Sequence, residues 1–356
     1  MRKIRVGIIG QGRSGRGIHG CWLMQDKQKY EIIAVSDPIK HRRDQATQEY
    51  GCAVYSKYQS LLERNDLDLI VNTLPSNLHM STTLEILRAG LNCVCEKPMA
   101  DNLKDMDRLI MAVKKTKKTV AVFQQYRYAP SFLQLRKIID SGVLGRIVQI
   151  NVASNGFNRR YDWQSLQKFM GGSLLNTGTH SLDQMLQLFG TDIVPEVFCH
   201  MDRATTVGDS EDHVLISLRG QGRPLINLEF SSCYPFPTPL YKVYGTQGGL
   251  EATMIQMTWR YFNSAENPMP RLTTKPLFNP DKTPAYPLNT ITKWRKGNWS
   301  VRTQPSVWFN NMSKQFYAML YKNLTVGTPL EITLEQIRHQ VAIIEKCQQQ
   351  NPLIYR

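Results

Sequence analysis

Short runs of apolar residues alternate with amphipathic segments through the first third of the chain. The runs have the length of strands, and the segments between them carry apolar residues at helical spacing. This alternation predicts an α/β fold, a parallel, right-handed, doubly wound sheet with helices on both faces. We expect strands at 4–9, 31–36, 67–73, 91–95 and 119–124, and helices at 40–50, 57–64, 81–89 and 103–115.

The pattern changes beyond a linking helix at 130–141. Apolar and polar residues now alternate one by one, as in strands that bury a single face of an antiparallel sheet. We therefore expect a first domain at 1–125 and a second, α+β domain at 126–356 with a large, open, mainly antiparallel sheet. Its clearest strands are 146–153, 213–219, 225–230 and 240–244, its turns are 220–222 and 248–249, and helices at 306–323 and 333–349 complete it.

Residues 259–305 follow neither pattern and are rich in proline and basic side chains. An irregular loop of that length is uncommon unless it is functional or part of an interface. An open sheet also needs its exposed face covered, and assembly of identical chains is the usual means. We therefore expect a homo-oligomer, a dimer or a tetramer, that forms through the open sheet.

The composition is that of a soluble globular protein, because 42% of the 356 residues are hydrophobic and 21% are charged. No apolar run approaches the roughly 20 residues that span a membrane, and none near the start has the length of a signal peptide. We therefore expect a cytoplasmic protein without a membrane partner. The seven cysteines lack paired spacing and nearby histidines, which predicts reduced thiols and no metal site.

The formal net charge of +15 raises the question of a nucleic-acid partner. The basic residues are dispersed, however, and the one real cluster, 114–118, lies at the expected end of an amphipathic helix, where lysines complement the helix dipole. No helix-turn-helix or zinc-finger spacing accompanies it. We therefore expect no nucleic-acid partner, and the excess charge is compatible with anionic ligands such as dinucleotides.

The first expected strand leads directly into Gly10-Gln-Gly-Arg-Ser-Gly15, a G-x-G-x-x-G fingerprint. Gly10 permits the tight turn, Gly12 lets a pyrophosphate approach the backbone, and Gly15 lets the next helix pack on the strand. The start of that helix offers free N–H groups to the phosphates. Asp37 ends the second strand, 22 residues after Gly15, where a carboxylate accepts hydrogen bonds from an adenosine ribose. Together these features predict a Rossmann-type dinucleotide site.

Asp37 also bears on which dinucleotide binds. Its carboxylate would repel a ribose 2′-phosphate, which favours NAD. Arg13, Arg42 and Arg43 all lie within reach of the same region and are able to pair with that phosphate, so NADP stays open as the alternative. A structural role for Asp37, in the turn before Pro38, is the competing interpretation.

Two further strands are expected to end in polar residues at the same edge of the sheet. The third leads into the loop 74–79, and the fourth stops at Glu96-Lys97-Pro98. Ligands of open α/β sheets bind at the carboxyl ends of the strands, which makes Lys97 a candidate site residue. Glu-Lys-Pro is a common tripeptide, so an ordinary surface loop is the alternative.

Four motifs, in this order, resemble the glucose–fructose oxidoreductase, inositol dehydrogenase and MocA (Gfo/Idh/MocA) family. They are the glycine fingerprint, Glu96-Lys97-Pro98, the segment 127–130 with 141–147, and residues 171–180, and the resemblance covers residues 4–250. It implies a Rossmann domain followed by an open-sheet domain, with nicotinamide and a sugar ring between them. It also implies that Lys97 and His180 attend the carbon that is oxidised. The family usually has Asp four residues before that histidine, whereas this chain has Asn176.

Oxidation of a secondary alcohol requires a base for the hydroxyl proton, and neutral His180 is suited to that role. The i, i+4 spacing places Asn176 on the same helical face, but an amide supplies no charge, so His180 should be a weak base. Asp183, three residues after His180, is a candidate substitute partner. Lys97, desolvated beside a cationic nicotinamide, is a second candidate base. The alternative for His180 is a buried packing histidine.

The segment Arg159-Arg160-Tyr161-Asp162-Trp163 resembles the family's loop at the nicotinamide, although an ordinary surface loop is the alternative. Tyr126 and Arg127 allow the same two interpretations. The residues expected to bind the cofactor are Gly10, Gly12, Arg13, Ser14, Gly15, Asp37, Thr73, Pro75, Asn77, His79, Glu96, Lys97 and Trp163. Those expected at the substrate are Lys97, Arg127, Arg160, Asp162, Asn176, Thr177 and His180, with Lys97, His180 and Asn176 as the catalytic group.

These expectations lead to one main hypothesis and two alternatives. The main hypothesis is an NAD- or NADP-dependent oxidoreductase that acts on a secondary hydroxyl, at C3 by preference, of a sugar, cyclitol or glycoside. The first alternative is an NAD-recycling glycosidase or lyase, in which transient C3 oxidation permits elimination. The second is a non-catalytic cofactor-binding regulator, which would not need both Lys97 and His180.

Overall fold

The computed structural model describes residues 2–286, 291–302 and 304–355. Its first sheet has six parallel strands in the order β3-β2-β1-β4-β5-β6, which confirms the doubly wound prediction. Val6, Ile70 and Val94 are fully buried, as expected for strands covered on both faces. The strands are β1 (Ile4–Ile9), β2 (Tyr30–Ser36), β3 (Ala53–Tyr55), β4 (Leu69–Asn72), β5 (Asn92–Cys95) and β6 (Val120–Val122).

Helices follow the strands of this sheet, and the strand order reverses between β1 and β4. Such a reversal opens a crevice at the carboxyl ends of the strands, where dinucleotides bind. The first helical segment after β1 is wound as a π-helix. The helical segments are η1 (Gly15–Gly20), α1 (Cys21–Leu23), α2 (Lys40–Tyr50), α3 (Gln59–Leu62), η2 (Ser76–Leu78), α4 (His79–Arg88) and α5 (Leu103–Thr116).

The second sheet has eight strands in the order β14-β13-β12-β11-β7-β10-β9-β8. All neighbouring strands are antiparallel except β7 and β10, so the sheet is mainly antiparallel, as predicted. One face packs under helices, and Val152, Ile216 and Leu228 are buried there. The strands are β7 (Ile147–Asn155), β8 (Glu196–Asp202), β9 (His213–Arg219), β10 (Leu225–Ser231), β11 (Tyr241–Gly245), β12 (Gly248–Ala252), β13 (Gln256–Tyr261) and β14 (Arg295–Ser300).

Helical segments make up most of the connection between the sheets, and others begin at Trp163, after the loop that follows β7. They bring several polar side chains to the edge of the first sheet. The segments are η3 (Gln125–Tyr128), α6 (Pro130–Asp140), η4 (Trp163–Ser165), η5 (Gln167–Phe169), the π-helical η6 (Leu174–Gly178) and α7 (Thr179–Phe189).

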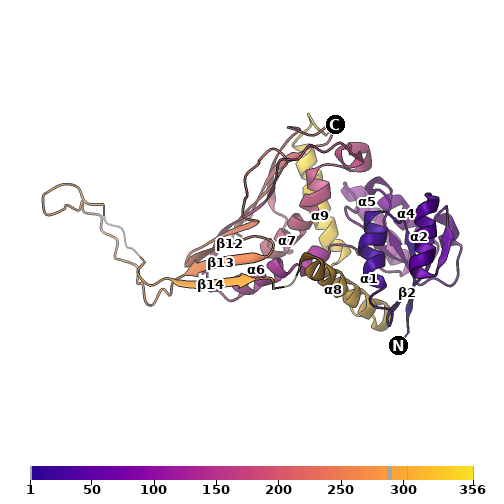
Figure 1. The fold of residues 1–356 in the computed structure, drawn as a ribbon. Coiled ribbons are helices and arrows are strands. Elements are labelled where there is room, and N and C mark those ends of the chain that lie inside the picture. The colour runs from indigo at the N-terminus through magenta and orange to yellow at the C-terminus, as the bar shows by residue number, and fades with distance from the viewer. Residues whose placement is uncertain (1, 287–290, 303, 356) are drawn as a thin grey trace.

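Two predictions for the second domain were wrong. Gly248 and Gly249 do not form a turn but open strand β12. Residues 259–305 are not irregular throughout, because β13 and β14 pair across the segment, with Trp259 against Gly297. Between these strands the described residues form a long arm that extends away from the body of the protein (Figure 1). Residues 287–290 and 303 of the same segment lie outside the described residues.

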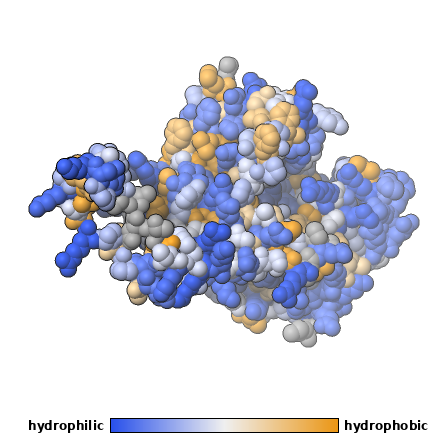
Figure 2. Space-filling model, turned by 60° about the vertical axis from the view of Figure 1, so that its left-hand side comes forward, coloured by the Kyte–Doolittle hydropathy of each residue, from blue (hydrophilic) through white to orange (hydrophobic). Residues whose placement is uncertain are grey.

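The last two helices, α8 (Pro305–Val326) and α9 (Leu334–Gln349), confirm the predicted C-terminal helices and return to the first domain. The hydroxyl of Tyr30 donates to the Tyr317 carbonyl at 2.6 Å, and α9 packs on α5 and β6 (Figure 1). The face seen in Figure 2 is largely hydrophilic, with hydrophobic residues in small separate groups. Among the described residues, no helix is long and apolar enough to span a membrane.

Candidate active site

The loop between β1 and η1 forms a cradle open to a phosphate. Gly10 has φ +91°, and a Cβ on Gly15 would lie 1.9 Å from the Gly10 carbonyl oxygen, so both positions require glycine. At Gly12 the nearest atom to a built Cβ is Arg42 Nη1, at 3.9 Å, so the approach is open. The predicted fingerprint thus has the shape that fits the pyrophosphate of NAD, and Arg13 and Ser14 lie on the same turn.

Asp37 is buried at the end of β2 beside this loop. Its carboxylate accepts the N–H groups of Gln11 and Ile39, both at 2.8 Å, and Arg42 Nη1 lies 3.4 Å away. Arg43 instead donates to the backbone carbonyls of Asp37 and Pro38. Asp37 therefore caps its own turn, and its place beside the glycine loop is also the one expected for ribose binding.

Glu96 forms a buried chain of hydrogen bonds beneath the site. His19, on η1, lies 3.2 Å from the Glu96 carboxylate through Nε2 and 2.7 Å from the Tyr317 hydroxyl through Nδ1. Burial acts to raise the pKa of Glu96, but the hydrogen bond to His19 and the charge of Lys97 lower it to about 2. Glu96 is thus an anion that connects the Glu-Lys-Pro loop to η1 and α8.

His79 joins the loops after β4 and β5. Its Nδ1 lies 2.7 Å from the Pro98 carbonyl and its Nε2 2.8 Å from the Leu74 carbonyl. Thr73 donates to the Ile9 carbonyl at 2.8 Å, which ties the β4 loop to β1. These two predicted cofactor residues hold the edge of the crevice together. Pro75 and Asn77, which are exposed beside them at η2, stay predicted contacts.

Lys97 reaches across the crevice to the second domain. Its ammonium donates to the backbone carbonyl of Asn176, on η6. Burial lowers the pKa of Lys97, Glu96 opposes the shift, and the charges of Arg13 and Arg160 add to it. The π-helical winding of η6 is a feature often found at functional sites. Lys97 is therefore a partly desolvated amine with a fixed direction.

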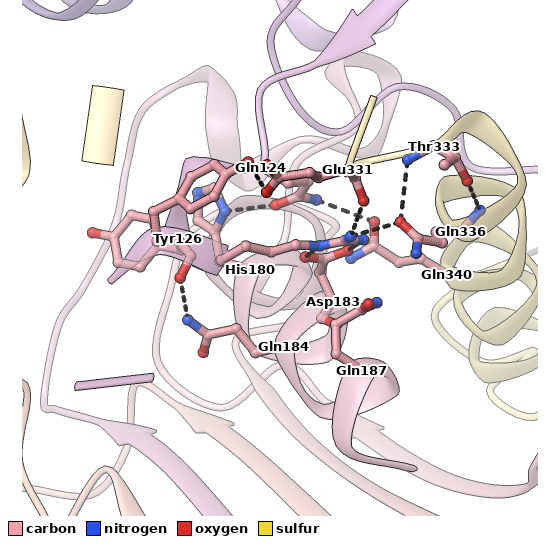
Figure 3. A network of polar contacts seen from close by, with 12 residues as sticks. Gln124, Tyr126, His180, Asp183, Gln184, Gln187, Glu331, Thr333, Gln336 and Gln340 are labelled. Atoms are coloured by element: carbon pink, nitrogen blue, oxygen red, sulfur yellow. Dashed lines mark hydrogen bonds and ion pairs between the residues drawn. The ribbon is translucent and has the colours of Figure 1, made fainter. Parts of the chain in front are cut away.

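His180 stands on α7 next to Lys97. Its Nδ1 lies 2.7 Å from Gln124 Oε1, and its ring stacks on Tyr126 with centroids 4.4 Å apart (Figure 3). Burial and the charge of Lys97 lower the pKa of His180 well below its ordinary value. The ring is therefore neutral near pH 7. The side-chain NH₂ of Asn176 donates to the Gln164 carbonyl at 2.9 Å. This hydrogen bond is not to His180, so it does not orient the imidazole.

The prediction that Asp183 partners His180 was wrong. Asp183 accepts two hydrogen bonds of 2.6 Å from the guanidinium of Arg127, and both side chains are buried. Arg127 also donates to Gln336 Oε1 at 2.6 Å and to the Glu331 carbonyl at 3.1 Å. With its N–H groups engaged in this way, Arg127 joins η3, α7 and the start of α9. This arrangement favours a structural role over the predicted substrate contact.

A cavity of about 400 Å³ lies beside Asn176 and Thr177 in the second domain. The exposed loop before it carries the Arg160–Asp162 ion pair, at 2.7 Å, and Trp163, which contacts Phe169 edge to face. The cavity is lined by Asn158, Arg159, Arg160, Gln164, Ser165, Gly172, Ser173, Asn176, Thr177, Thr206, Glu211, Asp212 and Ser232. The structure thus brings Arg160, Asn176 and Thr177, three of the predicted substrate residues, together around one cavity.

Two residues of this region were not predicted. Gln124 is the last residue of the predicted strand 119–124, and its position at the carboxyl edge was a usable signal. Glu211 is buried under the turn before η6, where Tyr355 donates to its carboxylate and the Leu174 N–H donates at 2.9 Å. No pattern in the sequence distinguishes Glu211. Among the described residues, no group of three His, Cys, Asp or Glu side chains is placed to hold a metal ion.

Known protein families and relatives match both domains of this chain. A model described as "Oxidoreductase family, NAD-binding Rossmann fold" matches residues 4–124, and a "GFO/IDH/MocA C-terminal domain" model matches 132–251. Scyllo-inositol 2-dehydrogenase (NADP(+)) IolW of Bacillus subtilis (strain 168) is 26% identical over 350 residues, 96% of this chain and 92% of the relative. The 2,7-anhydro-N-acetylneuraminate hydratase of Mediterraneibacter gnavus is 24% identical over 270 residues, 71% of this chain and 68% of the relative.

Solved structures share the fold over nearly the whole chain. The putative oxidoreductase yvaA from Bacillus subtilis superposes with a TM-score of 0.80 and 19% identity, and the match covers 99% of this chain and 96% of that one. GenD2 from gentamicin A biosynthesis, solved in complex with NAD, gives 0.79 and 18%, with 99% and 95% covered.

Proposed function

The chain belongs to the Gfo/Idh/MocA oxidoreductase family, and on this premise we propose that it transfers hydride between NAD or NADP and a secondary hydroxyl of a sugar, cyclitol or glycoside. The observation that carries the proposal is the hydrogen bond from Lys97, which follows β5, to the Asn176 carbonyl, four residues before His180 in the second domain. Dehydrogenases named among the relatives support the substrate class.

NAD, when bound, accepts the hydride from the carbinol carbon. The chain must then supply an acceptor for the hydroxyl proton and a donor that holds the substrate oxygen. His180 is neutral and half-buried, which suits the first role. Lys97 suits the second, because its direction is set by the Asn176 carbonyl. A Lys97 amine that has lost its proton would also be able to accept the hydroxyl proton.

The finer assignment is oxidation at C3 of a sugar or glycoside bound in the cavity beside Asn176 and Thr177. One comparison favours a second candidate, since a relative is named as a hydratase rather than as a dehydrogenase. An enzyme of that kind would oxidise the substrate transiently, eliminate or add a group, and regenerate NAD. A non-catalytic regulator is the third candidate, although it would not require Lys97 and His180 together.

One experiment separates the three candidates. Purified protein, its bound cofactor quantified, is incubated with NAD or NADP and a panel of sugars, cyclitols and glycosides while the absorbance of reduced nicotinamide is followed. Net reduction supports the dehydrogenase. Release of a leaving group without net reduction supports the recycling enzyme. Binding of cofactor without turnover of any compound supports the regulator.

Lys97→Met tests the site directly. We expect kcat to fall by about 100-fold or more, because the positioned amine is lost. Lys104→Met, at an exposed lysine of α5, is the matched control and should behave as the wild type. A Lys97→Met enzyme with full activity would remove Lys97 from the catalytic group.

A further inference from the structure

We infer that Gln124 and Gln340 form a directional chain of amides that fixes which ring nitrogen of His180 carries the proton. The inference rests on the proposed function for the role of His180 in proton transfer. The chain runs from the Thr179 carbonyl through Gln340 and Gln124 to the imidazole (Figure 3).

The Thr179 carbonyl is the anchor of the chain. It lies at the start of α7, and Gln340 on α9 directs its Nε2 toward it. A carbonyl oxygen accepts hydrogen bonds and never donates, so the NH₂ end of the Gln340 amide must face Thr179. The oxygen end of the same amide must then face away from Thr179, toward Gln124.

Gln124 passes this direction on to the histidine. Its Nε2 donates to Gln340 Oε1 at 3.1 Å, which leaves its Oε1 facing His180 Nδ1 at 2.7 Å. An amide oxygen is an acceptor only, so Nδ1 must carry the hydrogen. In a neutral imidazole the other nitrogen, Nε2, then has a free lone pair. His180 is thereby held in the tautomer that accepts a proton at Nε2.

The surroundings keep this arrangement fixed. Gln124 is 1% and Gln340 3% exposed, so water competes little for their amides. Tyr126 from η3 stacks on one face of the imidazole. The charged groups that act on the ring are Lys97 and Glu96 from the loop after β5, whereas Asp183 on the same helix is paired with Arg127.

The amide chain supplies the hydrogen-bond acceptor that a carboxylate would give, but without its charge. A carboxylate at this place would stabilise the imidazolium, whereas an amide leaves the ring neutral over a wider pH range. When the substrate O–H bond breaks, the proton forms a bond to His180 Nε2 as hydride leaves the carbon. Gln124 and Gln340 touch neither reacting atom and are positioning residues.

Nitrogen NMR of the protein, labelled with ¹⁵N-histidine and saturated with NAD, reads the tautomer without any need for turnover. The seven histidines make a small spectrum, and loss of one pair of signals in His180→Ala assigns the residue. We expect wild-type His180 to be protonated at Nδ1. We expect Gln340→Met to populate the Nε2-protonated form and to lower kcat about tenfold, with little change in KM for NAD.

Gln124→Glu is the complementary variant. Its carboxylate still accepts from Nδ1, so the tautomer should persist, but the added charge should move the acidic limb of kcat/KM to higher pH by about one unit or more. Gln187 lies on α7, the helix of His180, but outside the chain of amides. Gln187→Met is therefore the control and should change neither the spectrum nor the pH profile.

Two outcomes would overturn the inference. One is wild-type His180 protonated at Nε2 in the NAD complex. The other is a Gln340→Met variant that keeps the wild-type tautomer together with a Gln124→Glu variant that keeps the wild-type pH profile. If the protein turns over no substrate at all, the proposed function fails while the spectrum still decides the tautomer.

Discussion

One buried carboxylate, that of Asp37, holds three groups at the far end of the crevice. It accepts the N–H groups of Gln11 and Ile39 and lies near the Arg42 guanidinium. The negative charge of Asp37 would repel a ribose 2′-phosphate. It also pairs with the Arg42 guanidinium, which could otherwise bind that phosphate. We therefore expect cofactor choice to depend on both Asp37 and Arg42 and not on Asp37 alone.

Asp37→Ser should shift the preference toward NADP. The serine hydroxyl is still able to cap the turn, the repulsive charge is gone, and Arg42 becomes free to pair with a phosphate. We expect the ratio of kcat/KM for NADP to that for NAD to rise at least about tenfold, an effect of about 1.4 kcal/mol. Adding Arg42→Ala should cancel the gain, and an unchanged ratio in the single variant would refute this assignment.

Glu211 is a buried carboxyl whose ionisation is costly. Burial raises its pKa to about 7, although hydrogen bonds from Tyr355 and Leu174 act in the opposite direction. Because the folded pKa lies above the ordinary 4.5, its stabilising contribution is complete below about pH 4.5 and is lost as the pH rises through 7.

Glu211→Gln should therefore stabilise the protein at alkaline pH. The amide keeps the acceptor for Leu174 and gains a donor for Tyr355, with no charge to bury. The penalty removed is roughly 3 kcal/mol above pH 7. Melting temperatures of both proteins at pH 5 and pH 8 test this, and the variant should gain on the wild type between the two pH values. An equal difference at both would contradict the shifted pKa.

The candidate site was predictable where it depends on strand ends. Gly10, Asp37 and Lys97 each follow a buried strand, and parallel strands bring such residues to one edge. The two contacts of Asn176 on η6 could not be predicted from the sequence. Its backbone carbonyl accepts from Lys97, and its side-chain amide donates to the Gln164 carbonyl. That depends on π-helical winding, which no residue pattern encodes.

At the scale of elements, the hairpin β13–β14 was not predictable from the pattern of hydrophobic and polar residues. The sequence Arg295–Ser300 is mostly polar, and an edge strand needs little apolar character to pair. Its partner lies more than 30 residues away, so only the fold reveals the pairing. The first sheet was predictable because its buried strands are apolar and each is followed by a helix.

Gly297→Ala should loosen this hairpin. A Cβ at Gly297 would lie 2.1 Å from the indole of Trp259, so the ring or the strand must move. We expect a local cost of about 1–3 kcal/mol. Hydrogen exchange of β13 and β14 should accelerate while β7 and β10 are unaffected. Asn298→Ala, on the opposite face, is the control, and unchanged exchange in Gly297→Ala would argue against the close packing.

At the scale of the whole molecule, the outer face of the open sheet is polar rather than apolar. A row of hydrogen bonds crosses it from Ser217 through Asn227 to Asn151. Phe198 and Tyr244 stand exposed on the same face. Such a mixture of polar groups and exposed aromatic rings fits a hydrated contact between copies, which the expected homo-oligomer would use.

Tyr244→Glu tests that assembly. Light scattering coupled to size exclusion should give a dimer or a tetramer for the wild type and a smaller species for the variant, because a desolvated charge opposes association. Met111→Glu, exposed on α5 of the first domain, should leave the mass unchanged. A wild-type monomer would refute the expected oligomer, and an intact oligomer in Tyr244→Glu would place the contact elsewhere.

The return of α8 to the first domain has a consequence for synthesis on the ribosome. Phe123 and Tyr30 pack against Phe316 and Tyr317, yet Tyr317 is added 192 positions after residue 125. At ordinary rates of translation the nascent first domain waits roughly 10–40 s for α8 to be made. During that interval its aromatic surface is open to chaperones and to neighbouring nascent chains, so the yield of folded protein should depend on the speed of elongation through the second domain.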